Sequence, residues 1–599
     1  MNTLQKIGLG VFVMALLGFV SAIGWGTYQL TPEMAESHIS GEVKREAFMA
    51  AAEPLFGQEY GRNFAFVPAL KSAFQEGNEE IRNTYAYPSE TADWVISSFA
   101  EANRYNADQL TSGLAKYLNE DQIQSLRDNT SWMADKEYSD AQALRADLVT
   151  KIDELNANVG QSLGFSSSEI NSLLFTLTKE SSSGVLIESS WMVFLLVFGT
   201  GVAGALMYLL PMYRNEPPGI KNHHIFTSAI MNRGWLGIIL GTFLISFYVF
   251  LYWFPEYLTN WVLLVDPLSR ALSGHPASQW FLYGFMYTVV MLVMGIRMMI
   301  KYRGNRYQII RTLSVVFFQT AFAFLIPEIL VRLNQPYYDF KNIWPLDYDF
   351  FFNWHLSSLI ESGSLGIFML VWGIALIAVA IPVVTYLYGK RWYCSWVCGC
   401  GGLAETLGDP FRQLSDKSVK AWKIERWMIH SVLVFAAFMT GLTLYTYFSG
   451  NYSPFGIPTG GVQKTYGFLI GSAFAGVVGT GFYPLMGNRV WCRFGCPLAA
   501  YLGIVQRFKS RFRITTNGGQ CISCGNCSTY CEMGIDVKWY AQRGQNIVRS
   551  SCVGCGVCSA VCPRGVLKLE NGPESGRLEV GPITIGNKSI ELNPNVMNG

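Results

Sequence analysis

Eight cysteines near the end of the chain repeat one spacing twice, and this repeat restricts the possible fold more than any other feature. The first run is Cys521, Cys524, Cys527 and Cys531, and the second is Cys552, Cys555, Cys558 and Cys562. Bacterial ferredoxins bind two 4Fe–4S clusters with this spacing, and the fourth cysteine of each run ligates the cluster of the other run. The sequence therefore predicts one cluster on Cys521, Cys524, Cys527 and Cys562, and a second on Cys552, Cys555, Cys558 and Cys531.

The residues around the cysteines favour this interpretation. Gly525, Gly554 and Gly556 allow tight backbone turns around an inorganic core, where a Cβ atom would be crowded. Pro563 follows the last cysteine as the ferredoxin pattern expects, but Glu532 stands where the first run would have proline. We expect this change to leave ligation intact and to alter only the solvation of one cluster. Zinc sites usually pair two C-x2-C motifs across a longer loop, and disulfides need an oxidising compartment, so both alternatives are weaker.

The composition of the whole chain is that of an integral membrane protein. Half of its 599 residues are hydrophobic and only 15% are charged, whereas soluble domains carry about 25% charged residues. Several apolar segments are near or above the length of about 20 residues that a spanning helix needs. They are Ile7–Ile23, Trp191–Leu210, Gly234–Phe254, Trp280–Met299, Thr312–Leu333, Ser364–Tyr388, Trp427–Phe448 and Tyr466–Leu485. We therefore expect a mainly α-helical, polytopic membrane bundle of about eight spans.

Charge is distributed unevenly along the chain. Residues 31–190 carry 12 Lys and Arg against 25 Asp and Glu, so their net charge is −13 and that of the rest is +15. Basic loops concentrate on the cytoplasmic side of a membrane, which places the loops 213–233, 301–311, 390–426 and 489–513 inside. All 13 cysteines lie at or beyond Cys394, and therefore on the reducing side. We expect a multi-pass protein of the bacterial inner membrane with both termini in the cytoplasm.

These patterns divide the chain into five parts. They are a signal-anchor helix at 1–30, an acidic, α-rich periplasmic domain at 31–188, a membrane domain at 189–513, a cytoplasmic two-cluster ferredoxin domain at 514–572, and a tail at 573–599. In the periplasmic part, helical periodicity is clearest in Arg45–Phe56, Thr91–Tyr105, Ala107–Leu118 and Asp140–Val159. The acidic face of this part suits either an inert structural cap or a docking site for a basic partner such as a small cytochrome.

Four further cysteines form a second pattern in the membrane domain. The segment from Arg391 to Cys398 aligns with the segment from Arg489 to Cys496 as Arg-x-aromatic-Cys-x3-Cys, which indicates an internal duplication. Cysteines four residues apart share one face of a helix. Two such faces, with Cys394, Cys398, Cys492 and Cys496, could supply four thiolates to an iron–sulfur cluster or another soft metal. Cys400 is then a spare thiol. The alternative is that these thiols are reduced and fill space at a helix turn.

Other residues give weaker signals. No C-x2-C motif is followed by His, which excludes c-type haem, and His223, His224 and His430 are more typical of surface or interfacial residues. Glu328 lies in an apolar span, where ionisable groups often mark proton paths, although the proline before it could mark a kinked, hydrated end. The aromatic loop Tyr337–His355 is typical of an interfacial belt, with a quinone pocket as the minority interpretation.

The combination of these motifs resembles the NosR/NapH family of membrane-bound polyferredoxins. The resemblance covers about residues 191–569, and it depends on the eight ferredoxin cysteines and the two C-x3-C motifs. The family includes the membrane protein that supports nitrous-oxide reductase and the quinol-oxidising partner of periplasmic nitrate reductase, so the resemblance implies a periplasmic respiratory reductase as electron acceptor. NosR-type outer domains carry covalent FMN at a Thr in a Gly-Ala-Thr context. The poor match around Thr111 argues against FMN here, and Gly399 replaces the proline expected after Cys398.

The expected function is single-electron transfer between a cytoplasmic or quinone donor and a periplasmic reductase or redox partner. In this hypothesis no residue makes or breaks a substrate bond, and no nucleic-acid partner is expected. One alternative is a maturation or regulatory factor that supplies reductant for assembly of a periplasmic metalloenzyme. Another is a membrane cupric reductase, which would reduce copper directly.

Overall fold

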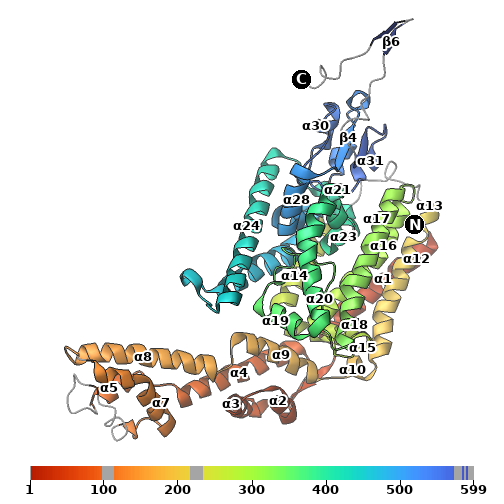
Figure 1. The fold of residues 1–599 in the computed structure, drawn as a ribbon. Coiled ribbons are helices and arrows are strands. Elements are labelled where there is room, and N and C mark those ends of the chain that lie inside the picture. Colours follow the sequence, from red (N-terminus) through yellow and green to blue (C-terminus); the bar gives the residue numbers. More distant parts are fainter. Residues whose placement is uncertain are drawn as a thin grey trace. The chain divides into compact units, whose positions relative to one another are not determined.

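The computed structural model describes residues 2–97, 105, 114–136, 138–215, 234–571, 583–585 and 588–590. Within these residues the chain is mainly helical, as expected. It divides into two compact units, one of residues 1–18, 194–253 and 265–599 and one of residues 19–193 and 254–264. Figure 1 labels the helices and strands of both units.

Seven helical segments among the described residues are long and apolar enough to cross a membrane. They are Thr3–Gly24 with α1 (Thr3–Ser21), Ser190–Arg214 with α11 (Ser190–Phe194) and α12 (Thr200–Leu209), Trp235–Trp253 (α14), Gln279–Lys301 (α16), Arg306–Arg332 with α17 (Arg306–Phe317) and α18 (Ile326–Arg332), Gly363–Tyr388 with α20 (Gly363–Ala375) and α21 (Ile381–Tyr388), and Val419–Ser449 (α24). Each coincides with one of the predicted spans, so the chain is a multi-pass membrane protein.

The eighth predicted span, Tyr466–Leu485, lies in a helical path that is not among these seven. The path consists of α25 (Thr459–Tyr466), a π-helical stretch (Gly467–Val478) and α26 (Gly479–Gly481). The stretch after α25 is strongly apolar, but α25 itself is polar, so the apolar part of the path is short. It begins beside the end of α24, where the hydroxyls of Thr446 and Thr459 are 2.6 Å apart. That this segment crosses the membrane stays a prediction.

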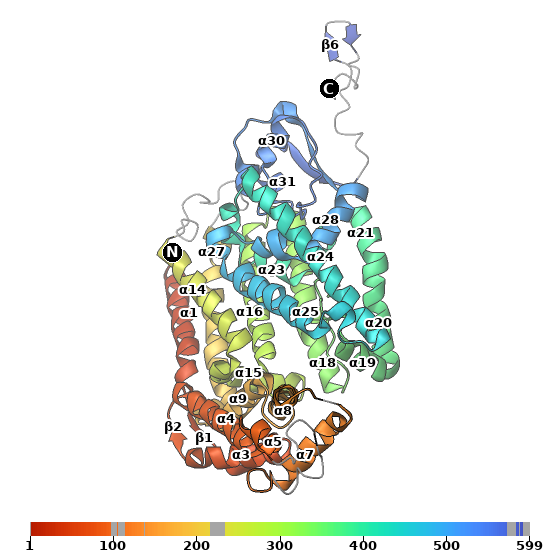
Figure 2. The ribbon, with the colours of Figure 1, turned by 90° about the vertical axis from the view of Figure 1, so that its left-hand side faces the viewer.

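The start of α1 lies at the same end of the bundle as the ferredoxin fold (Figure 2). Gln5 in α1 donates to the carbonyl of Tyr208 at the end of α12 (3.4 Å). The guanidinium of Arg303, just past α16, lies 4.6 Å from the ring centre of Tyr213. Tyr307 at the start of α17 donates to the backbone of the second cysteine run (2.8 Å). These contacts join the start of α1, the end of α12, the end of α16 and the start of α17 to the ferredoxin end.

The ferredoxin fold is closed by pairing of its first and last strands. β4 (Arg513–Thr516) and β5 (Leu567–Glu570) are antiparallel, with Arg513 opposite Glu570 and Thr516 opposite Leu567. Three short α-helices lie between them: α29 (Asn526–Thr529), α30 (Val537–Gln542) and α31 (Val557–Val561). In the tail, β6 (Ile583–Ile585) pairs with β7 (Lys588–Ile590).

The second unit is a small helical domain with one short sheet. Its helices are α2 (Pro32–His38), α3 (Glu42–Ala52), α4 (Asn63–Tyr85), α5 (Thr91–Ser97), α7 (Glu120–Thr130), α8 (Ala141–Ser162), α9 (Ser167–Glu180) and α10 (Val185–Glu188). Polar side chains begin several helices: Asp140 caps α8, and Asn119 and Ser166 form capping boxes on α7 and α9. The sheet has the order β2 (Glu59–Tyr60), β1 (Thr27–Gln29), β3 (Ser182–Ser183) and was not predicted. Most of the predicted helix 107–118 lies outside the described residues.

Candidate iron–sulfur sites

The first cluster set comes together around one small pocket. Cys521, Cys524, Cys527 and Cys562 all line it, although the last is 35 positions beyond the third. Cys527 lies in α29, which begins after Gly525 at a positive φ of 80°. Cys524 is exposed. This set therefore lies at the solvent-facing rim of the fold.

The second cluster set lies inward, against the membrane bundle. Cys552 and Cys558 are buried, and α31, which carries Cys558, begins after Gly556 at a φ of 75°. Burial raises the pKa of the Cys558 thiol, and the nearby thiols of Cys555, Cys552 and Cys531 raise it further. These four side chains are thus close neighbours, as the crossed ligation pattern requires.

Side chains of the membrane domain bind the backbone of the second run. Tyr307 donates to the carbonyl of Gly554 (2.8 Å), and Gln308 donates to that of Cys555 (2.7 Å). The hydroxyl of Ser395 donates to the carbonyl of Val553 (2.7 Å). Hydrogen bonds to buried carbonyls fix the backbone because leaving such groups unpaired is costly. The ferredoxin fold is therefore docked on the bundle through its second run.

The four C-x3-C thiols also surround one small cavity. Cys394, Cys398, Cys492 and Cys496 line it together with Cys400, Tyr393, Trp491, Leu498 and Ala499. From their spacing we expected the two cysteines of each motif to share one helix face, but in the structure they do not. Cys394 ends α22 (Arg391–Cys394) and Cys398 precedes α23 (Gly399–Glu405) in an extended conformation. Cys496 likewise precedes α28 (Pro497–Lys509). The helix breaks inside each motif, and the break turns both thiols to one side.

The surroundings of these thiols fit a buried, negatively charged group. Arg489 Nη1 lies 3.7 Å from Cys492 Sγ, and the backbone N–H of Ala499 points to Cys496 Sγ (3.4 Å). Arg489 Nε and Trp491 Nε1 are buried and have no hydrogen-bond partner among the described residues. Buried donors without a partner are rare, and N–H donors to cluster sulfurs are a usual feature of iron–sulfur sites. The donor set therefore fits a cluster held by four thiolates.

A buried ion-pair network lies between the second cysteine run and the C-x3-C thiols. Five basic side chains meet three carboxylates; they are Arg297, Lys301, Arg311, Arg412 and Arg489 with Glu405, Asp409 and Glu532. Cys555 Sγ lies within 4.8 Å of carboxylate oxygens of Glu405 and Glu532. Burial opposes ionisation of Glu405, but the surrounding arginines outweigh it and hold the pKa of Glu405 below its usual range. The two surplus positive charges suit a network placed between two anionic thiolate sites.

Glu532 has a larger role than the sequence suggested. It is fully buried, and its carboxylate contacts Arg412 (2.5 Å) and Arg489 (3.0 Å). Its backbone carbonyl accepts a hydrogen bond from Ser415 (2.7 Å). The expectation that Glu532 alters only the solvation of one cluster was wrong. A proline at this position could not link the first run to the arginines of the membrane domain.

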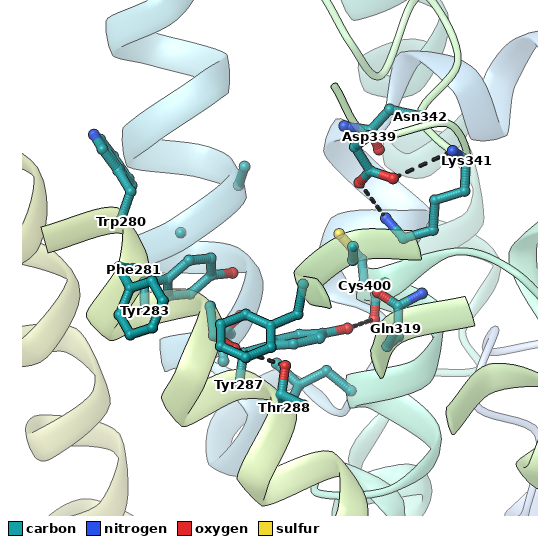
Figure 3. Close-up of a pocket in the computed structure, with 18 of the residues that line it drawn as sticks. Trp280, Phe281, Tyr283, Tyr287, Thr288, Gln319, Asp339, Lys341, Asn342 and Cys400 are labelled. Atoms are coloured by element: carbon teal, nitrogen blue, oxygen red, sulfur yellow. Dashed lines mark hydrogen bonds and ion pairs between the residues drawn. The ribbon is translucent and has the colours of Figure 1, made fainter. Parts of the chain in front are cut away.

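A cavity of about 740 Å³ extends from the C-x3-C thiols into the bundle. Cys400 and Cys492 line one part of it, and rings of Tyr252, Tyr283 and Tyr287 line another. Figure 3 shows Tyr283 and Tyr287 on α16 and Asp339 paired with Lys341 beside the cavity. Its size is within the range of small-molecule sites, and its lining mixes aromatic rings with polar and charged side chains. The spare thiol Cys400 thus borders both cavities.

Gly399 brings the wall of this cavity against the first C-x3-C motif. The hydroxyl of Tyr287 donates to the carbonyl of Gly399. A Cβ atom at position 399 would lie 2.9 Å from Gln319 Oε1 and 3.0 Å from the Tyr287 hydroxyl. The expected proline would therefore displace both side chains from the motif. The departure of Gly399 from the pattern has a steric reason that the sequence could not show.

Of the residues that gave weaker signals in the sequence, some line the large cavity, one lies on a helix away from it, and the rest lie outside the described residues. Glu328 and part of the aromatic loop, from Tyr337 to Leu346, contribute to the lining of the large cavity. His430 Nδ1 lies 2.6 Å from a backbone carbonyl of its own helix, and the residue is half-buried. His223, His224 and Thr111 lie outside the described residues.

Comparison with known proteins identifies 4Fe–4S domains at both thiol-rich regions. A family model described as "4Fe-4S binding domain" matches twice, at residues 370–418 and 467–515. Each match contains one C-x3-C motif, which confirms the internal duplication. A model described as "4Fe-4S dicluster domain" matches residues 513–563, which contain all eight ferredoxin cysteines.

Similar curated proteins are few and match only in part. The electron transport protein YccM of Escherichia coli (strain K12) is 28% identical over 170 residues, 27% of this chain and 46% of the relative. The methylamine utilization ferredoxin-type proteins MauN of Methylorubrum extorquens and Paracoccus denitrificans are 26% and 28% identical, over 26% of this chain and 54% and 52% of theirs. The chain thus spans about half the length of these relatives. No solved structure matches significantly. The chain is a multi-pass, mainly helical membrane protein that carries 4Fe–4S ferredoxin-type domains.

Proposed function

We propose that the protein transfers single electrons between a cytoplasmic or quinone donor and a periplasmic respiratory reductase or redox partner. The observation that carries this proposal is the continuous buried contact between its two thiol-rich regions. Arg311 donates to the carbonyl of Cys555 (3.0 Å) and pairs with Glu405 (2.5 Å), and Glu405 pairs with Arg489 (2.7 Å) beside Cys492. The names of YccM and MauN, an electron transport protein and a ferredoxin-type protein, support the same class of function.

Twelve cysteines hold the redox groups in this proposal. Cys521, Cys524, Cys527 and Cys562 bind one 4Fe–4S cluster, and Cys552, Cys555, Cys558 and Cys531 bind a second. Cys394, Cys398, Cys492 and Cys496 bind a third iron–sulfur group, supported by their shared cavity and by the 4Fe–4S model that matches both motifs. Such clusters supply one-electron chemistry. Arg489 and Trp491 are placed to donate hydrogen bonds to the third group.

The large cavity serves as the quinone site in this proposal. A quinone dissolves in the bilayer and carries electrons along or across a hydrocarbon layer of about 30 Å. The rings of Tyr252, Tyr283 and Tyr287 offer flat contacts, and Gln319 and Thr288 offer polar ones. Glu328 also lines the cavity, and an ionisable group within a span is suited to proton exchange.

The proposed orientation places both termini in the cytoplasm of a bacterium and the acidic unit in the periplasm. The contacts that put the start of α1 and the ferredoxin fold at one end of the bundle support a common side for the two termini. The net charge of −13 between residues 31 and 190 supports docking of a basic redox protein.

Iron and sulfide analysis with EPR on protein purified without oxygen tests the proposal. Two cubanes contain about eight irons, and a third cluster raises the content to about twelve. Replacement of Cys524 and Cys555 by Ser should abolish reduction of the partner in membranes. Colourless anaerobic protein, or unchanged electron flux in this variant, would refute the proposed function.

A further inference from the structure

The ferredoxin fold carries a surface of stacked arginine and aromatic side chains next to its exposed cluster set. One side of α30 faces the pocket of the first cysteine set, which Lys538 and Ala541 line. Gln542 at the end of α30 donates to the hydroxyl of Ser523 (2.7 Å), the neighbour of exposed Cys524. Helix α30 is therefore part of the rim through which this set reaches solvent.

Arginine and aromatic side chains alternate from α30 to the start of α24. The guanidinium of Arg543 lies 4.2 Å from the ring centre of Trp539, and the Trp539 and Tyr540 ring centres are 4.9 Å apart. Arg549 donates to the Tyr540 hydroxyl (3.0 Å) and lies 4.9 Å from the ring of Trp422. Arg426 lies 5.6 Å from the same ring. We call these six residues the Arg–Trp strip.

The strip presents positive charge and apolar rings to solvent. Arg543 and Arg426 are exposed, and Trp539 retains 42% of its surface. The carboxylates on the same two elements are engaged elsewhere: Asp536 accepts from Ser528 (2.6 Å), and Glu425 is buried against Arg493 (3.1 Å). Arginine, Trp and Tyr are the residues most enriched in the energetic centres of protein interfaces.

We infer that the Arg–Trp strip is the docking surface for an acidic one-electron carrier protein, which exchanges electrons with the cluster at Cys521, Cys524, Cys527 and Cys562. This inference rests on the proposed function and names the chemistry of its soluble partner. The carrier would be oxidised by one electron and the cluster bound by these four cysteines would be reduced by that electron, with no proton transferred. The second set is covered by Tyr307, Gln308 and Ser395 of the bundle, so the first set is the accessible one.

A soluble carrier explains the strip better than anionic lipid does. Binding to a lipid surface would need only the residues of α24 at the membrane boundary, Trp422 and Arg426. The strip continues instead onto α30, beside the cluster pocket, where a protein partner brings its own redox centre close. Opposite charge on the two partners accelerates association by about 10- to 1,000-fold, and salt screens this effect.

The test uses the purified, cluster-loaded full chain and flavodoxin, an acidic flavoprotein, as the reductant in anaerobic stopped-flow experiments. The double variant Arg426→Glu with Arg543→Glu should slow cluster reduction at least about 10-fold at low salt, and the difference should shrink at high salt. The milder pair Arg426→Gln with Arg543→Gln should give a smaller loss in the same direction. Lys568→Glu, a single charge reversal at an exposed residue outside the strip, should have little effect.

Dithionite, which is too small to need a docking surface, separates this inference from the proposed function. It should reduce the clusters of every variant with much less slowing than flavodoxin shows, because a small anion feels the changed charge but needs no docking surface. Equal slowing with dithionite would mean structural damage and would overturn the inference, as would unaltered flavodoxin rates in both pairs. Loss of binding to phosphatidylglycerol vesicles without loss of flavodoxin reactivity would assign the strip to the membrane instead. Absence of any reducible cluster would refute the proposed function itself.

Discussion

Replacing Glu532 by Gln should loosen the ferredoxin fold from the membrane domain while preserving the shape of the side chain. The variant removes one of three carboxylates that hold Arg412 and Arg489, both of which are buried. Unit charges 4 Å apart attract by about 4 kcal/mol at an effective dielectric constant of 20, and loss of one partner of a buried pair typically costs about 3–5 kcal/mol. Because Gln keeps a hydrogen-bonding oxygen and Arg412 retains Glu405 and Asp409, we expect about 3 kcal/mol, the lower end of that range.

Hydrogen–deuterium exchange of the second cysteine run measures this loss. A change of about 3 kcal/mol increases the open fraction by roughly 100-fold, so amides 552–558 should exchange about 100-fold faster if opening is local. Glu570→Gln is a matched control, because it removes the same charge from the same fold but its carboxylate accepts only from Thr515 among the described contacts. Protection unchanged in Glu532→Gln, or reduced equally in Glu570→Gln, would refute the reasoning.

Three further predictions concern the membrane-side sites. Gly399→Pro should fill the cavity wall and weaken binding of a quinone analogue at least about 10-fold in a titration, with the iron content unchanged; unaltered affinity would contradict the quinone assignment. The double variant Cys394→Ser with Cys492→Ser should lose about four irons per chain, and iron content equal to that of the unaltered protein would exclude a third cluster. Ser395→Ala removes one hydrogen bond to the second run and should cost about 1 kcal/mol of docking stability in the same exchange experiment; Ser523→Ala, at an exposed hydroxyl of the first run, is its control.

Local patterns in the sequence predicted the parts of the fold that depend on near neighbours. Seven of the eight predicted spans coincide with helices of spanning length, because length and hydropathy are properties of continuous stretches. Spacing likewise anticipated the grouping of Cys562 with the first set, which the structure places around one pocket. The path around Tyr466–Leu485 was harder, because the polar helix α25 leads into it and shortens the apolar part of the path.

Contacts between residues far apart in the chain could not be predicted from the sequence. Glu532 and Arg412 are 120 positions apart, and no local rule pairs them. The helical face predicted for Cys394 and Cys398 was wrong because a spacing of four residues does not reveal a helix that ends between them. The cavity wall at Gly399 depends on Tyr287 from another helix, so its steric role became visible only in three dimensions.

The unequal covering of the two cysteine runs has a practical consequence for handling the protein. Oxygen and chelators will reach the metal behind exposed Cys524 well before that behind the buried Cys552 and Cys558. Damaged preparations should therefore be uniform species that have lost only the outer cluster of the ferredoxin fold, rather than random mixtures. Iron contents measured after exposure to air would then understate the native stoichiometry by one defined cluster.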